Sequence, residues 1–266
     1  MRWRIVKALC LLLSATTVQA VVIRHDVALE EYQPKSVPGY FINMPHEGSA
    51  ALIDKHWLLT AGHVIYYESY VGKTINVHGV DNVIEKVIFH SDFKRMPKQP
   101  FEGDAKPLMD FLYGRTDLVL VKLAKPVTHV NSVSRYYGTD ELFKKTISYG
   151  SGALGNGLTG EQLNTKERRS ILFFENRIES VYENYLTMRF DTSSRALALE
   201  GIHGSGDSGG PTVVNEDGEV LLIGIQSFRD YQGQLSRFRG GIYDSVSVLV
   251  RVSAFNHWID QVMSNN

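Results

Sequence analysis

Residues 206–211 read Gly-Asp-Ser-Gly-Gly-Pro, and no other stretch of the chain constrains fold and chemistry as strongly. Glycines on both sides of Ser208 permit a sharp turn and let a carbonyl group approach the backbone closely. The backbone N–H groups of Gly206 and Ser208 can then point at a developing oxyanion, often the largest single catalytic contribution. A glycine-rich hairpin turn with an incidental serine is the alternative, so Ser208 needs partners elsewhere in the chain.

A serine is a poor nucleophile without a base beside it, and the chain offers a histidine for that role. Residues 57–62, Trp-Leu-Leu-Thr-Ala-Gly, form an apolar strand that runs into small residues, and His63 follows them. Its imidazole is therefore expected at a strand end with space around it. Histidine suits a base because it titrates near neutrality.

Asp117 opens an apolar stretch, residues 118–123, whose only polar member is Lys122. A carboxylate at the start of a buried strand is costly unless a polar or cationic group pairs with it. The second ring nitrogen of His63 would be that partner and would fix the tautomer and orientation of the ring. Taken alone, Asp117 is explained equally well as a residue that caps a turn.

β-strand patterns extend over most of the chain after residue 21. Asp217-Gly218 separates two apolar runs, which is a strong hairpin signal. Many short strands predict two closed or nearly closed β-barrels. The expected strands include residues 52–53, 57–59, 83–89, 118–123, 211–214 and 220–223.

Only the C-terminus carries a helical pattern. Apolar residues recur at helical spacing from Val252 to Val262, with Ser253 as the expected N-cap. Prolines between residues 97 and 107 predict a long loop, and residues 152–170 predict another.

The composition bounds the class of protein. The chain has 266 residues, 43% of them apolar, with 28 Lys+Arg against 29 Asp+Glu. This length and content suffice for one large domain or two modest ones, and exclude a disordered or collagen-like chain. The balanced charge gives no electrostatic footprint for nucleic acid, so no nucleic-acid partner is expected.

Residues 1–20 have the layout of a secretory signal peptide. A basic start precedes the apolar run 8–15, and small residues end at Ala20. The run is too short to span a bilayer as a stable helix; a buried N-terminal helix is the alternative. Cleavage would remove Cys10, the single cysteine, and leave a protein without disulfides. We therefore expect a secreted protein, extracellular or periplasmic, with no membrane association after cleavage.

The order His63, Asp117, Ser208 resembles that of the chymotrypsin-like serine peptidases, the family that includes trypsin. There the histidine follows a Thr/Ser-Ala-Ala/Gly step, the aspartate opens an Asp-Ile-Ala-Leu type of strand, and the serine lies in Gly-Asp-Ser-Gly-Gly-Pro. The resemblance implies an all-β fold of two six-stranded antiparallel barrels with a C-terminal helix. It assigns residues 21–131 to the N-terminal barrel and 132–266 to the C-terminal barrel and helix, together one peptidase domain.

The same resemblance implies a secreted serine endopeptidase that acts through an acyl-enzyme, without metal or organic cofactor. Ser208 would attack the carbonyl, His63 would take and return the proton, and Asp117 would hold His63. Gly206 and Ser208 would supply the oxyanion donors. Protein or peptide substrates and a monomeric state are expected. Two alternatives stay open: a non-catalytic binding homologue of this fold, and an esterase on the same scaffold.

The implied specificity pocket, which receives the side chain before the scissile bond, departs from that of trypsin. Six residues before the serine, trypsin-like members place an acidic pocket floor, and this chain has Ile202. Ser227-Phe228 resembles the Ser-Trp that pairs with substrate backbone, and Arg229 replaces a glycine of many members. These four residues are expected to bind substrates with small or apolar side chains before the scissile bond. Two acidic residues of the following segment offer an alternative, a Lys- or Arg-binding pocket: Asp230 and Asp244.

The resemblance also implies an ion pair at the start of the processed chain. Family members bury a new apolar N-terminus beside the aspartate that precedes the serine, here Asp207. Cleavage after Ala20 would expose Val21 for this pairing without a separate propeptide; cleavage one residue later would make Val22 the partner. The family's cysteines are absent, with Gly48, Val64 and Gly204 in their places, so packing alone is expected to hold the serine loop.

Overall fold

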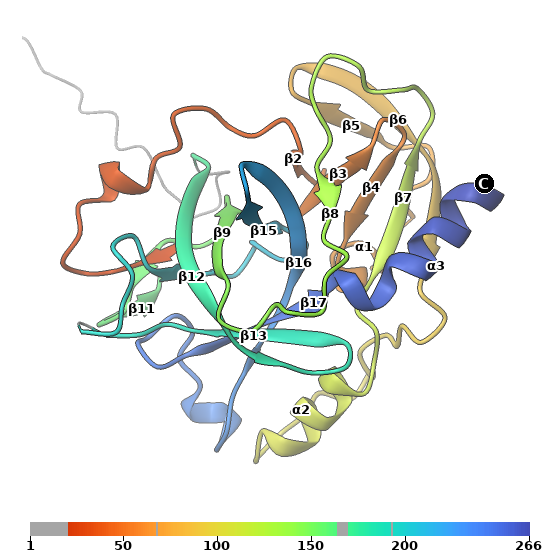
Figure 1. Ribbon diagram of the computed structural model, residues 1–266. Helices are drawn as coiled ribbons and strands as arrows, with labels where there is room; N and C mark the ends of the chain where they lie inside the picture. Colours follow the sequence, from red (N-terminus) through yellow and green to blue (C-terminus); the bar gives the residue numbers. More distant parts are fainter. Residues whose placement is uncertain (1–20, 68, 164–169, 193) are drawn as a thin grey trace, which may run out of the picture.

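The computed structural model describes residues 21–67, 69–163, 170–192 and 194–266. The predicted signal peptide and Cys10 therefore lie outside the described residues. Two β units stand side by side, and the chain crosses from the second back onto the first through the C-terminal helix α3, Val252–Asn265 (Figure 1).

The first unit is an antiparallel sheet whose strands, among the residues described, follow the order β2-β3-β4-β7-β6-β5. The His78 ring, in the turn between β5 and β6, bonds the carbonyl of Phe41 in β2 at 3.1 Å, so the two edges of the sheet approach each other. The sheet thus curls into a barrel. Its strands are β2 (Phe41–Asn43), β3 (Ser49–Asp54), β4 (Trp57–Thr60), β5 (Thr74–Val77), β6 (Val80–Phe89) and β7 (Val119–Leu123).

The second unit is a closed barrel. Its strands follow the order β15-β9-β12-β13-β17-β16, and β16 pairs back onto β15. The predicted hairpin at Asp217-Gly218 is confirmed, since both residues have positive φ, 51° and 91°, as a tight hairpin turn requires. Its strands are β9 (Lys145–Gly150), β12 (Leu172–Val181), β13 (Tyr185–Arg189), β15 (Pro211–Glu216), β16 (Glu219–Asp230) and β17 (Val246–Arg251), with β8 (Ser134–Arg135) added beside β16.

The two ends of the described chain each pack on the opposite unit. Near the start, β1 pairs with β10 and β14 of the second unit, while at the end Lys122 Nζ of the first unit donates to the carbonyl of Asn266 at 2.6 Å. The predicted class, mostly β with two barrel-like sheets and a C-terminal helix, is confirmed. The small sheet contains β1 (Val22–Ile23), β10 (Gly155–Asn156), β11 (Gly160–Glu161) and β14 (Gly201–Ile202).

The expectation of a single helix was wrong. Helix α2, Lys106–Tyr113, lies in the segment predicted as a long loop. Its Pro107 occupies the first turn, where a missing N–H costs no hydrogen bond, and Met109 and Leu112 are buried. Short helices also occur: α1 (Gly62–Ile65), η1 (Leu29–Tyr32) and η2 (Leu235–Arg237).

The predicted cap of α3 was wrong as well. Arg251 is the N-cap and makes no side-chain cap hydrogen bond. The Ser253 hydroxyl instead donates to Glu141, which also pairs with Arg251 at 2.7 Å. A buried carboxylate that needs donors outcompetes the helix end for this serine.

Strand β7 makes the fold sensitive to a single core substitution. Leu120 is fully buried and lies opposite Leu59 of β4 and Ile88 of β6. Leu120→Ala should lower the free energy of unfolding by about 3 kcal/mol, measured by urea denaturation, because the cavity cannot collapse between two paired strands. Val83→Ala, at a 42% exposed position of β6, serves as the control and should change it by about 0.5 kcal/mol or less. Equal losses in the two variants would contradict the packing described here.

Candidate active site

His63 and Asp117 meet where β4 ends and β7 begins. The His63 backbone N–H donates to Asp117 Oδ1 at 2.9 Å, and Nδ1 of its ring lies 2.6 Å from Oδ2. The Asp117 side chain is fully buried, whereas the His63 side chain is 23% exposed. A carboxylate on Nδ1 selects the tautomer with the proton there, which leaves Nε2 to accept a proton.

The Asp117 carboxylate stays ionised although it is buried. Burial opposes ionisation, but the electrostatic attraction and hydrogen bond of His63 and the charge of Arg115 outweigh it and hold the pKa of Asp117 well below its usual range. Ser227 Oγ also donates to Asp117 Oδ2, at 2.6 Å. Ser227 belongs to β16 of the second barrel, so this carboxylate joins the two barrels.

Arg115 is a member of the site that the sequence does not reveal. Its Nη2 lies 3.6 Å from Asp117 Oδ2, and its side chain is 3% exposed. The guanidinium lies over the rings of Phe93 and Phe111, which stabilise a cation. Because an arginine four residues before a strand can point in any direction, spacing alone offers no signal for this contact.

The loop of Ser208 docks against β3 and against β4, the strand that leads to His63. The Ser208 carbonyl accepts a hydrogen bond from Ser49 N–H at 2.8 Å. Gly209 adopts φ 78°, and a side chain at this position would collide with Thr60 Oγ1. The positive φ and the close approach to Thr60 both require glycine at position 209, because a Cβ would be strained there and would push the loop away from the strand that leads to His63.

The backbone N–H groups of Gly206 and Ser208 are available to a ligand. Within the described residues neither of them donates a hydrogen bond. The carbonyl of Ser205 accepts from Ala153 N–H at 2.7 Å, and in a trans peptide the N–H of the next residue, Gly206, points the opposite way. This arrangement suits an oxyanion.

Asp207 is buried next to Val21. Its carboxylate accepts hydrogen bonds from Gly152 N–H and Gly204 N–H, each at 2.6 Å. A side chain on Gly150 would collide with both Asp207 Oδ1 and Val21 Cγ1, so Asp207 and Val21 both lie against the Cα atom of Gly150. Burial raises the pKa of Asp207 to about 7, because these hydrogen bonds offset the lost hydration only in part.

A cavity of about 320 Å³, here called the cleft cavity, opens beside Ser208. Ser227, Phe228 and Arg229, predicted to bind substrate, line it. Its other walls come from α2, from the loop between β14 and β15 and from the segment after β16: Leu108, Met109, Leu112, His203, Gly204, Ser205, Tyr231, Leu235 and Phe238.

Ile202 does not line the cleft cavity. It is fully buried in a small cluster with Val22 and Phe190, against which Tyr243 packs. His203 lines the cavity instead, and its Nδ1 shares a 2.7 Å hydrogen bond with Ser247 Oγ. Burial lowers the pKa of His203 to about 3, so the ring is neutral at physiological pH.

Neither acidic residue that offered a Lys- or Arg-binding alternative lines the cleft cavity. Asp230 accepts a hydrogen bond from the Tyr113 hydroxyl at 3.2 Å. Asp244 lines a separate cavity and lies 3.9 Å from Arg195.

Comparisons with known proteins identify the family of this chain. The family model described as Trypsin matches residues 26–259. Mouse transmembrane protease serine 11E is a curated relative, 27% identical over 228 residues, which are 80% of this chain and 48% of the mouse protein. The chain thus spans about half the length of that relative. Among the described residues, no helix is long and apolar enough to cross a membrane.

The burial of Asp117 makes it a stability determinant as well as a site residue. Asp117→Ala should lower the free energy of unfolding at pH 7 by about 3–5 kcal/mol, because Arg115 would be left buried without its carboxylate. In the folded protein the pKa of Asp117 lies below its ordinary value of 3.8. The stabilisation that its carboxylate provides is therefore present above about pH 4 and is lost as the pH falls further. The difference between wild type and variant should therefore shrink in acid. Asp92→Ala, with a carboxylate that is 72% exposed, is the control, and an equal effect of both would contradict the prediction.

Proposed function

The chain belongs to the trypsin family of serine proteases, and on that premise we propose that it is a secreted endopeptidase that cleaves peptide bonds through an acyl-enzyme. The observation that carries the proposal is the 2.6 Å contact between His63 Nδ1 and a fully buried, ionised Asp117. A buried carboxylate on this nitrogen leaves Nε2 as a base for the serine of residues 206–211.

The proposed reaction has two halves. Ser208 Oγ attacks the carbonyl carbon while His63 takes its proton, and the same imidazolium then protonates the departing amine. Water repeats the sequence on the acyl-enzyme and restores Ser208. Asp117 stabilises the imidazolium in both halves, and the N–H groups of Gly206 and Ser208 receive the oxyanion.

Two rivals are separated by simple assays. A non-catalytic binding homologue would not be labelled at Ser208 by an organophosphonate, whereas a peptidase and an esterase both would. Casein and short-chain nitrophenyl esters as substrates then distinguish those two enzymes. The free N–H groups of Gly206 and Ser208 favour an enzyme, because a binding module has no need of them.

Secretion and activation form one proposed event. Signal cleavage after Ala20 would free the Val21 α-amino group next to Asp207, where an ammonium would neutralise a buried carboxylate. The pairing would hold the loop between Gly204 and Ser208 in the geometry that exposes the oxyanion donors.

The proposed triad predicts a large loss of turnover on removal of either reacting group. Ser208→Ala and His63→Ala should each lower kcat on a peptide substrate by several orders of magnitude, because the members act as a unit. Ser91→Ala, on the surface of the first barrel, should leave kcat unchanged. A loss of less than about tenfold in kcat for Ser208→Ala would contradict the assignment of Ser208 as the nucleophile.

The N-terminal pairing predicts that extension of the processed chain disorders the active site. A form with Met-Gly before Val21 should be far less active than one that begins at Val21. In the extended form Asp207, with its pKa raised to about 7, contributes stability that is fully present below about pH 4 and lost as the pH rises through 7. As the pH is raised from 5 to 8, the thermal midpoint of the extended form should therefore fall relative to that of the processed form.

Asp207→Asn in the extended background provides the control, since an amide does not titrate and should abolish that pH-dependent difference. Full activity of the extended form would refute the pairing and leave Asp207 to another partner.

A further inference from the structure

A buried ion pair joins two segments that flank the specificity pocket. Arg229 Nη1 and Nη2 each donate to one oxygen of Glu161, both at 2.8 Å, and the two side chains are only 8% and 7% exposed. Arg229 lies in β16, two residues after Ser227, and Glu161 lies in β11 of the small sheet. Planar bidentate pairing of this kind is strong and geometrically specific.

The pair is also bonded to the segment from His203 to Ser205, which forms part of the wall of the cleft cavity. Arg229 Nη2 also donates to the carbonyl of His203 at 2.8 Å, and Ser205 donates to Glu161 through its N–H at 2.7 Å and its hydroxyl at 3.1 Å. A side chain on Gly240 would collide with both members of the pair. The ionised Glu161 is strongly favoured: its pKa is lowered to about 2, because Arg229 and Ser205 outweigh the cost of burial.

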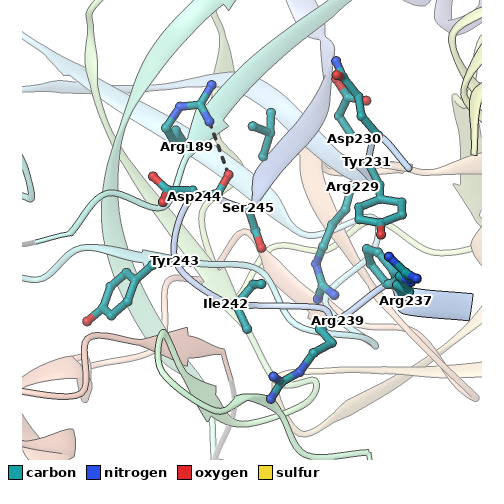
Figure 2. A pocket seen from close by; sticks show the side chains of 13 residues that line it. Arg189, Arg229, Asp230, Tyr231, Arg237, Arg239, Ile242, Tyr243, Asp244 and Ser245 are labelled. Atoms are coloured by element: carbon teal, nitrogen blue, oxygen red, sulfur yellow. Dashed lines mark hydrogen bonds between the residues drawn. The ribbon is translucent and has the colours of Figure 1, made fainter. Parts of the chain in front are cut away.

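Arg229 separates two cavities. It lines the cleft cavity beside Ser208 and also a second cavity of about 530 Å³, here called the rear cavity. In Figure 2 its side chain runs from β16 toward the segment that carries Arg239 and Ile242. The rear cavity has no Ser208 in its lining, and Arg229, Tyr231 and Phe238 line both cavities. A substrate side chain that enters beside Ser208 would therefore have to pass these shared residues, the guanidinium among them, to reach this space.

We propose that the Arg229–Glu161 pair is a partition across the specificity pocket that restricts cleavage to sites preceded by small, uncharged side chains. This inference rests on the proposed peptidase function. A large side chain would have to displace a buried, fully paired guanidinium. Lysine or arginine would in addition place a second cation beside Arg229, where the charge of Glu161 is already paired with Arg229 and His203 is neutral.

Acidic side chains are excluded by competition. A substrate carboxylate would find in Arg229 and Ser205 the donors that Glu161 already occupies. Because Glu161 is tethered in the same chain, its effective concentration at that position exceeds that of any substrate. Glu161 thus stands where an acidic substrate side chain would bind, and its removal should expose a carboxylate site.

Two variants test the partition through substrate preference. If the Arg229–Glu161 pair only stabilised the fold, its removal would not change that preference. Glu161→Gln keeps an oxygen that can accept from Ser205 N–H but removes the charge, so peptides with Glu before the scissile bond should gain at least about tenfold in kcat/KM relative to Ala peptides. Glu161→Gln combined with Arg229→Gly joins the two cavities, so Phe and Leu peptides should gain by a similar ratio.

The chain offers a matched control in a second Arg–Glu pair with a serine hydroxyl on it. Arg251 and Glu141 pair at 2.7 and 3.0 Å, Ser253 donates to Glu141, and neither charged residue lines either cavity. Glu141→Gln with Arg251→Gly should lower the thermal midpoint without a change in preference.

Two results would overturn the partition. One is a wild-type enzyme that cleaves mainly after large or charged residues. The other is a folded, active Glu161→Gln enzyme whose preference for the side chain before the scissile bond is the same as that of the wild type. If the double variant does not fold, Glu161→Gln alone decides. A wild type that neither cleaves peptides nor reacts with an organophosphonate refutes the proposed function instead.

Discussion

The buried carboxylate of Asp117 is the interaction on which the rest of the site depends. It accepts from the ring and backbone of His63 in the first barrel and from the Ser227 hydroxyl in the second, with Arg115 beside it. A carboxylate without hydration is tolerated only when such donors surround it. The position of one barrel against the other is therefore tied to the orientation of one imidazole.

The described residues contain no cysteine, since the single cysteine is Cys10. The expectation that packing alone holds the serine loop was incomplete. Packing does act where Gly48 lies against Val64, with a would-be Cβ 2.9 Å from its methyl groups. The loop before Ser208, however, is held by hydrogen bonds from Ser205 to Glu161, and Arg229 fixes that carboxylate in turn. Ionic contacts thus hold this loop in a described chain that contains no disulfide.

The two ends of the described chain add a further constraint on how the barrels pack. Val21 and Val22, at the start of the described chain, are fully buried in the second unit, while α3 closes on the first. The largest hydrophobic cluster among the described residues accordingly includes strands of both barrels and residues of α3, such as Phe255 and Ile259. Local disturbance at either end is expected to reach the cleft, because neither barrel completes its packing alone.

The sequence by itself determined the fold class, the hairpin at Asp217-Gly218 and the candidate triad, because strand periodicity, turn residues and the order of His63, Asp117 and Ser208 are properties of the chain read in one dimension. Helix α2 escaped prediction because prolines mark both loops and first helical turns. Only the tertiary structure decided that Arg115 lies beside Asp117 and that Glu161 meets Arg229, 68 residues away. Sequence spacing does not say which distant side chain an arginine will meet, and those contacts exist only once the chain has folded into its tertiary structure.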